Sequence, residues 1–377
     1  MTRRSKGWGK ADGHLDLLSG ALGRRTMLGA GLAAAALGGL GRPAFAQGAA
    51  WPTRPVRLIV AYPAGGSTDI VARLLAEQLT RVWNQPVVVD NRAGAAGTIG
   101  ADSVAKTTPD GYTLLLAASP EIAIARSTQR NLPYDPVRDF APVNLLAQSP
   151  FLLMVTPGIN VSNVQELIAL ARARPGALNY ASFGNGTSNH FVGELFKVSA
   201  GVDITHVPYR GSGPMMTDLI GGTVQLAFDT IPAGLPHVRA GRLRALGAAM
   251  LRRSSLAPEI PTLDEQGLRG FTGGSWVGLV APARTPDPVV AKIAADVDRV
   301  MADGFSRELE QRGLAPEGLG PAAFRDFIEA EVVKWGDVAR RASSNGPGCA
   351  AARRDPAACA ALGPTGRAWR AARRSWS

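Results

Sequence analysis

The sequence predicts an α/β protein with two lobes, and three observations support this prediction. Apolar strand-like runs alternate with amphipathic helical runs, which is typical of mainly parallel sheets flanked by helices. Two glycine-bearing loops each lie between a strand-like run and a helical run. Residues 47–345 have the composition of a folded protein, and their length suits two lobes rather than one.

Strand-like and helical runs alternate along parts of the chain. The strand-like runs are residues 56–61, 87–89, 113–117, 152–155, 178–181, 204–207, 224–228, 245–248 and 277–281. Helical runs are predicted in residues 70–83, 164–173, 191–196, 214–220, 289–301 and 324–338. We expect the last of these helices to end the fold.

Two short segments are the expected crossings between the lobes. A proline interrupts two apolar runs at Gln148-Ser149-Pro150, and Gly273-Gly274-Ser275 precedes the last strand-like run. Lobe one is therefore expected to contain residues 51–149 and 275–345, and lobe two residues 150–274. A ligand would bind in the cleft between them.

The two glycine-bearing loops are the strongest functional signal. They are residues 63–69 (PAGGSTD) and residues 182–188 (SFGNGTS). The start of a helix has unpaired backbone N–H groups and the positive end of the helix dipole, so it attracts anions. Two such starts facing each other would hold a small carboxylate. The alternative is that the glycines and hydroxyl residues serve only as turns and caps.

The N-terminus has the features of an export signal, residues 1–46. Arg24 and Arg25 precede a small apolar stretch, and Ala44-Phe45-Ala46 is a small-x-small cleavage site. The arginine pair favours twin-arginine export, and Sec export is the alternative. Cleavage is expected near Ala46. No later stretch approaches membrane-spanning length, so we expect a soluble, periplasmic protein.

The C-terminal residues 346–377 are rich in Ala, Arg, Gly and Pro and show no helical or strand period. This composition predicts a disordered tail, either a natural extension or the product of a frameshift. It contains both cysteines, Cys349 and Cys359, so residues 47–345 cannot form disulfides.

The net charge of +11 comes from the two ends of the chain, because residues 47–345 contain 28 basic and 27 acidic residues. This balance gives no support for nucleic-acid binding by the folded part. The histidines lack metal-ligand spacing, and no dinucleotide or catalytic motif is present, so neither a metal nor another cofactor is expected.

A series of short motifs resembles the receptors of tripartite tricarboxylate transporters, also called the Bug family of periplasmic solute-binding proteins. The resemblance covers residues from about 52 to about 342. The motifs are YPAGGSTD (62–69), VDNRAGAAG (89–97), PDGYTLL (109–115), YASFGNGTSNH (180–190), HVPYRG (206–211), PTLDEQG (261–267) and SWVGL (275–279).

The resemblance implies a type II periplasmic-binding-protein fold that closes around a small carboxylate and presents it to a membrane permease. It also implies ligand-binding residues in both loops. At the far end of the ligand it implies two more, one after the third predicted strand and one after the seventh. These are Ala64, Gly65, Gly66, Ser67 and Asp69 in the first loop, Ser182, Gly184, Gly186, Thr187 and Ser188 in the second, and Ser119 and Asp229 beyond them.

Two positions in or beside these loops allow more than one interpretation. Asn189 lies where members of this family often carry a small hydroxyl residue. Asp69 starts a helix, where a carboxylate caps free amides, but it could instead accept from an ammonium group of a ligand.

The expected function is that of a monomeric transport receptor. An orphan receptor feeding a two-component sensor is the first alternative. The second alternative is a periplasmic hydrolase or isomerase with the same two-lobed fold, although the sequence shows no set of catalytic residues.

Overall fold

The computed structural model describes residues 51–344. From Pro52 onward these residues belong to one compact unit. The predicted export signal (1–46) and the predicted tail (346–377) lie outside the described residues, so both remain predictions. None of the helices within residues 51–344 is long and apolar enough to cross a membrane.

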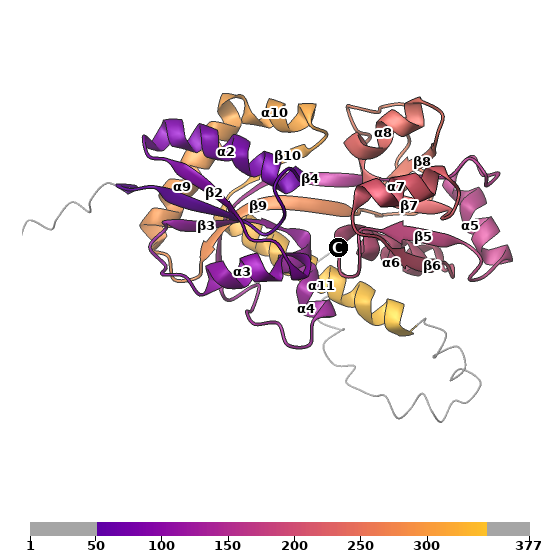
Figure 1. The fold of residues 1–377 in the computed structure, drawn as a ribbon, viewed down its shortest axis with the longest axis horizontal. Helices are drawn as coiled ribbons and strands as arrows, with labels where there is room; N and C mark the ends of the chain where they lie inside the picture. The colour runs from indigo at the N-terminus through magenta and orange to yellow at the C-terminus, as the bar shows by residue number, and fades with distance from the viewer. Residues whose placement is uncertain (1–50, 345–377) are drawn as a thin grey trace, which may run out of the picture. The chain divides into compact units, whose positions relative to one another are not determined.

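Strands and helices alternate along most of the described chain (Figure 1). The strands are β1 (Val56–Val60), β2 (Val87–Asn91), β3 (Thr113–Ala118), β4 (Phe140–Val155), β5 (Asn179–Ser182), β6 (Thr205–Pro208), β7 (Leu226–Thr230), β8 (Arg244–Ala248), β9 (Gly274–Pro282) and β10 (Ala315–Leu319). The α-helices are α2 (Ser67–Trp83), α3 (Thr98–Ala105), α4 (Ala125–Thr128), α5 (Val164–Ala173), α6 (Ser188–Ala200), α7 (Ser212–Ile220), α8 (Ile231–Arg239), α9 (Asp287–Val300), α10 (Ser306–Gln311) and α11 (Pro321–Ser344). Short turns of other helix types are η1 (Ala95–Gly97), η2 (Pro120–Ile124) and η3 (Met301–Phe305).

The strands form two sheets that share β4. One has the order β2-β1-β3-β9-β4, with β10 also on β4, and the other has the order β4-β7-β5-β6, with β8 also on β4. Strands joined by helical crossovers run parallel, such as β1 with β3 and β5 with β7. Both β9 and β7 run antiparallel to β4. The α/β class is confirmed, and the sheets are mixed where we expected mainly parallel ones.

Strand β4 is much longer than the run 152–155 that its sequence predicts. Its first part pairs with β9 up to Pro150 opposite Gly274, and from Phe151 onward it pairs with β7 and β8. Pro142 lies at a register irregularity and Pro150 at the change of partner. A proline cannot donate to a ladder, so both fit only where the pairing is interrupted.

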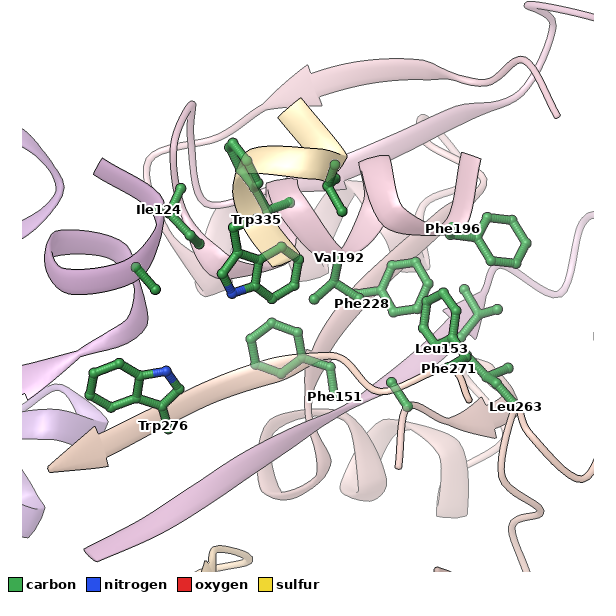
Figure 2. Close-up of a cluster of buried hydrophobic side chains, with 14 of the residues drawn as sticks. Ile124, Phe151, Leu153, Val192, Phe196, Phe228, Leu263, Phe271, Trp276 and Trp335 are labelled. Carbon is green, nitrogen blue, oxygen red and sulfur yellow. The ribbon is translucent and has the colours of Figure 1, made fainter. Parts of the chain in front are cut away.

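Helices cover both faces of the sheets. In Figure 1, α2 and α10 lie on one side of the first sheet and α3 lies on the other. Helix α11 packs across the region where the sheets join, and its Trp335 is fully buried among apolar side chains (Figure 2). The Trp335 ring meets the ring of Phe191 on α6 edge to face, with 6.0 Å between centroids. A long helix therefore connects the packing of both sheets.

Candidate functional site

Helices α2 and α6 are the two helices that follow the glycine-bearing loops. Helix α2 begins after Gly66 and α6 after Thr187, and no side chain at either N-cap position accepts a hydrogen bond from its helix. The first backbone N–H groups of a helix have no partner within it. Both helix starts can therefore offer amides to a bound group.

A cavity of about 140 Å³ contains residues from both helix starts. Its lining comes from segments that are far apart in the chain. The lining residues are Tyr62, Ser67, Thr68, Val71, Ala118, Pro120, Ser149, Phe151, Phe183, Thr187, Ser188, Asn189, Thr230, Ser275, Val277 and Leu314. None of these described residues carries a charge at neutral pH, and half of them are hydroxyl residues.

Alternate residues of β4 and β9 line this cavity. Ser149 of β4 lies opposite Ser275 of β9 in the ladder, and both line the cavity. Their neighbours Gln148 and Trp276 line a larger cavity of about 360 Å³. Ser275 lines both cavities, so the two cavities lie next to each other along β4 and β9. The larger cavity contains none of the loop residues predicted to bind a ligand.

Three of the predicted site residues, Ser67, Thr187 and Ser188, line the smaller cavity. The other nine do not line it, and they are Ala64, Gly65, Gly66, Asp69, Ser119, Ser182, Gly184, Gly186 and Asp229. Their assignment as ligand-binding residues therefore stays a prediction. The contacts of several of them give each a definite structural role.

Asp69 holds the first loop together. Its Oδ2 accepts from the Gly65 amide at 2.8 Å and from Arg73 Nε at 2.9 Å, and its Oδ1 accepts from Asn91 Nδ2 at 2.9 Å. The pKa of this buried carboxyl is lowered to about 2, and the hydrogen bond from Arg73 is the largest cause. Both oxygens are in use, which favours the structural role of Asp69 over contact with a ligand ammonium group.

In the second loop, side chains bind the glycine amides that we expected to be available. The Gly184 amide donates to Ser182 Oγ at 3.0 Å, and the Gly186 amide donates to His190 Nδ1 at 3.3 Å. Both glycines have positive φ, 129° and 79°, which a side chain would disfavour. The loop is thus braced from within, and the amides at the start of α6 are the ones left for a ligand.

Ser182 and His206 form a close pair that the sequence analysis missed, because they are distant in the chain. Ser182 Oγ lies 2.6 Å from His206 Nε2. Ser182 is fully buried and does not line the cavity. Burial lowers the pKa of His206 to about 3, so the imidazole stays neutral. The pair braces the loop and has no access to a substrate, unlike a serine nucleophile with its base.

Ser119 and Asp229 lie directly beside lining residues. Ser119 Oγ accepts from the Trp276 amide at 3.1 Å, which ties β3 to β9. Asp229 Oδ2 accepts from Ser212 Oγ at 2.6 Å, and its Oδ1 accepts from the Thr230 amide at 2.7 Å. Burial raises the pKa of Asp229 to about 6. Both residues position the wall of the cavity.

Two buried polar atoms at the start of α6 have no hydrogen-bond partner among the described residues. They are Ser188 Oγ and Asn189 Nδ2, and both residues line the cavity. Asn189 was noted in the sequence only as an unusual residue. Ser149 and Ser275 lie outside both loops, at the two expected lobe crossings, but they were not predicted to line a site. Leu314 has no local signal that marks it.

The described residues contain no group of three or more His, Cys, Asp or Glu side chains that could hold a metal ion. The residues that line the smaller cavity offer hydroxyl groups, a side-chain amide and apolar surface.

Comparison with known proteins gives one consistent result. Residues 71–343 match the family described as "Tripartite tricarboxylate transporter family receptor". Protein BugT of Bordetella pertussis is 36% identical over 307 residues, which are 81% of this chain and 94% of BugT.

Solved structures agree with this match. An R. palustris protein solved with adipate is 39% identical, with a TM-score of 0.70 over 78% of this chain and 98% of its own. MatC from Rhodopseudomonas palustris, solved with bound malate, is 33% identical, with a TM-score of 0.67 over 77% of this chain and all of MatC.

Proposed function

This chain belongs to the tripartite tricarboxylate transporter receptor family of non-enzymatic periplasmic solute-binding proteins, and we propose that it captures a small carboxylate between α2 and α6. One observation carries the proposal: the starts of both helices line one uncharged cavity. Each helix start is equivalent to roughly half a positive charge, so two together match one carboxylate.

The chemistry of the cavity supports anion recognition without a cation. Hydroxyl groups of Ser67, Thr68 and Ser188 lie among the lining residues at the helix starts. Phe151, Val277 and Leu314 add apolar surface for the body of a small organic acid. Adipate and malate, found in two relatives, are small organic acids of this kind.

The change of partner in β4 supports a two-lobed receptor. The chain passes from one sheet to the other between Pro150 and Phe151 and returns at Gly274. We propose the division predicted from the sequence, with residues 51–149 and 275–345 in lobe one and 150–274 in lobe two. Closure around the ligand is then a hinge motion at these crossings.

The proposed destination of the ligand is a membrane permease of the tripartite tricarboxylate type, with the receptor acting as a monomer in the periplasm. The family description supports a transporter partner. A sensor kinase is the alternative partner. Uptake of labelled acid by cells with and without the receptor separates the two, because a sensor would change gene expression and leave the uptake of acid by the existing transporter unchanged.

A binding screen tests the proposal directly. Purified protein is mixed with adipate, malate, succinate or benzoate, and with neutral amide analogues of the same acids as matched controls. We expect at least one acid to raise the melting temperature and to bind with 1:1 stoichiometry in calorimetry, and its amide to bind much more weakly. NMR of the recovered acid should show no chemical change. Equal binding of acids and amides, or a new product, would contradict a carboxylate receptor.

A further inference from the structure

We propose that Asn189 is a specificity-determining residue whose side-chain amide donates a hydrogen bond to an oxygen of the bound carboxylate. This inference rests on the proposed function and assigns part of the recognition to a side chain as well as to the backbone. Asn189 is the second residue of α6 and lines the cavity. Its side-chain nitrogen Nδ2 is buried and has no partner among the described residues.

The hydrogen bonds of the other amide atom determine which way the side chain faces. Asn189 Oδ1 lies 3.3 Å from the Phe183 amide and 2.7 Å from Thr187 Oγ1. A backbone N–H can only donate, so the atom opposite Phe183 must be the oxygen. The NH₂ group is therefore the free end, and it can act only as a donor.

The burial of that donor indicates that something must accept from it. Asn189 is only 1% exposed, and a buried donor without an acceptor is unfavourable. Ser188 Oγ is unpartnered in the same way on the preceding residue. A hydroxyl can donate or accept, but the amide NH₂ requires an acceptor. A carboxylate oxygen placed at the start of α6 provides one.

Neither the N-cap position of α6 nor the Gly186 amide depends on Asn189. Thr187, not Asn189, occupies the N-cap position of α6. The Gly186 amide has its own acceptor in His190 Nδ1. Asn189 Oδ1 accepts hydrogen bonds from the loop and so has a structural role. Its Nδ2 remains available to bind the carboxylate. A substitution that keeps the acceptor and removes the donor separates the two tasks.

Asn189→Asp makes that separation. The carboxylate has the same shape and can still accept from Phe183 and Thr187, but it cannot donate when ionised and it repels an anion. Asn179→Asp is the matched control, because it makes the same change of charge on β5 outside the cavity. The probe is the tightest-binding acid among adipate, malate, succinate and benzoate, titrated by calorimetry at pH 7.5.

We expect Asn189→Asp to weaken binding of that acid by about 10- to 100-fold, whereas Asn179→Asp should leave it unchanged. The preference for the acid over its neutral amide should shrink in Asn189→Asp. Affinity should recover as the pH falls and the new carboxyl takes up a proton, because a protonated carboxyl can donate again. A residue with only a structural role would not give this pH profile.

The side-chain NH₂ signals in a ¹⁵N–¹H spectrum of the wild-type protein give a test that does not depend on a variant that folds. Saturation with the same acid should shift the Asn189 signals and leave those of Asn179 in place. Wild-type affinity in Asn189→Asp, or unchanged Asn189 signals at saturation, would overturn the inference while leaving the receptor function intact. If wild-type protein binds none of the four acids, the proposed function fails and the inference fails with it.

Discussion

Tyr62 donates a hydrogen bond of 2.6 Å from its hydroxyl to Oε2 of Glu121, which lies buried behind it. Tyr62 lines the cavity, immediately before the first loop. The other oxygen of Glu121 accepts from the Ala118 amide at 2.6 Å. One buried carboxyl therefore connects the first loop to the end of β3. Burial raises its pKa to about 7, despite both hydrogen bonds.

Glu121→Gln should make stability less dependent on pH. A folded-state pKa of about 7, against an ordinary value of 4.5, means that the folded protein holds a proton that the unfolded chain has released between these values. The free energy of unfolding should therefore fall as the pH rises from about 4.5 to about 7. Glutamine imitates the protonated acid and removes this loss, which is at most about 3 kcal/mol.

Urea unfolding at pH 5 and pH 8 measures this effect as a difference between wild type and variant. Glu77→Gln is the control, because Glu77 is an exposed surface residue paired with Arg81. An equal loss of stability with pH in wild type and Glu121→Gln would show that Glu121 is not the group responsible.

Asp69→Asn should destabilise the protein by about 2 kcal/mol at pH 7, because it removes a buried charge that accepts three hydrogen bonds. The folded-state pKa is lowered from 3.8 to about 2, so this stabilisation is present above about pH 4 and is lost as the pH falls through 2. The gap between wild type and variant should close on acidification. Asp337→Asn, which changes an exposed carboxylate paired with Arg340 on α11, should have a much smaller effect. A gap that stays constant down to pH 2 would contradict this account.

Gly65→Ala and Gly66→Ala form a matched pair in the first loop. Gly65 has φ of +84°, which costs a residue with a side chain about 1 kcal/mol. Gly66 has φ of −75°, and an added Cβ would lie 3.5 Å from Pro63 O, which is ordinary contact. We expect Gly65→Ala to lower both stability and carboxylate affinity, and Gly66→Ala to change stability by only a few tenths of a kcal/mol. Thermal unfolding and calorimetry check both, and equal effects would rule out the backbone explanation.

Ser182→Ala should act through the shape of the second loop. It leaves His206 Nε2 and the Gly184 amide without their shared partner, which costs about 1–3 kcal/mol. Adding His206→Phe to Ser182→Ala should cost less than the sum of the two single changes, because they remove one shared interaction. Ser103→Ala is the control, since its hydroxyl donates only to a carbonyl of its own helix. Strict additivity in urea unfolding would show that the pair does not act together.

The sequence alone determined the α/β class, most of the elements and the two loops. Local patterns carried these predictions, such as the helical period of 164–173, which matches α5 residue for residue. The turn glycines of both loops could also be predicted from the sequence. Gly65, Gly184 and Gly186 adopt positive φ, which the turn itself requires and which favours glycine. Strand β4 was underestimated because its prolines are local signals against a strand, and a register irregularity and a change of partner accommodate them.

Only the tertiary structure decided which atoms face the cavity. Ser149 and Ser275 meet across a ladder between strands that lie far apart in the chain. Likewise, Ser182 engages His206 instead of the cavity, and the free donor of Asn189 is known only because its oxygen faces Phe183. A local pattern places a side chain on an element, but the partner that occupies its hydrogen-bonding atoms comes from long-range packing. The atoms available to a ligand are those that have no hydrogen-bond partner within the folded protein.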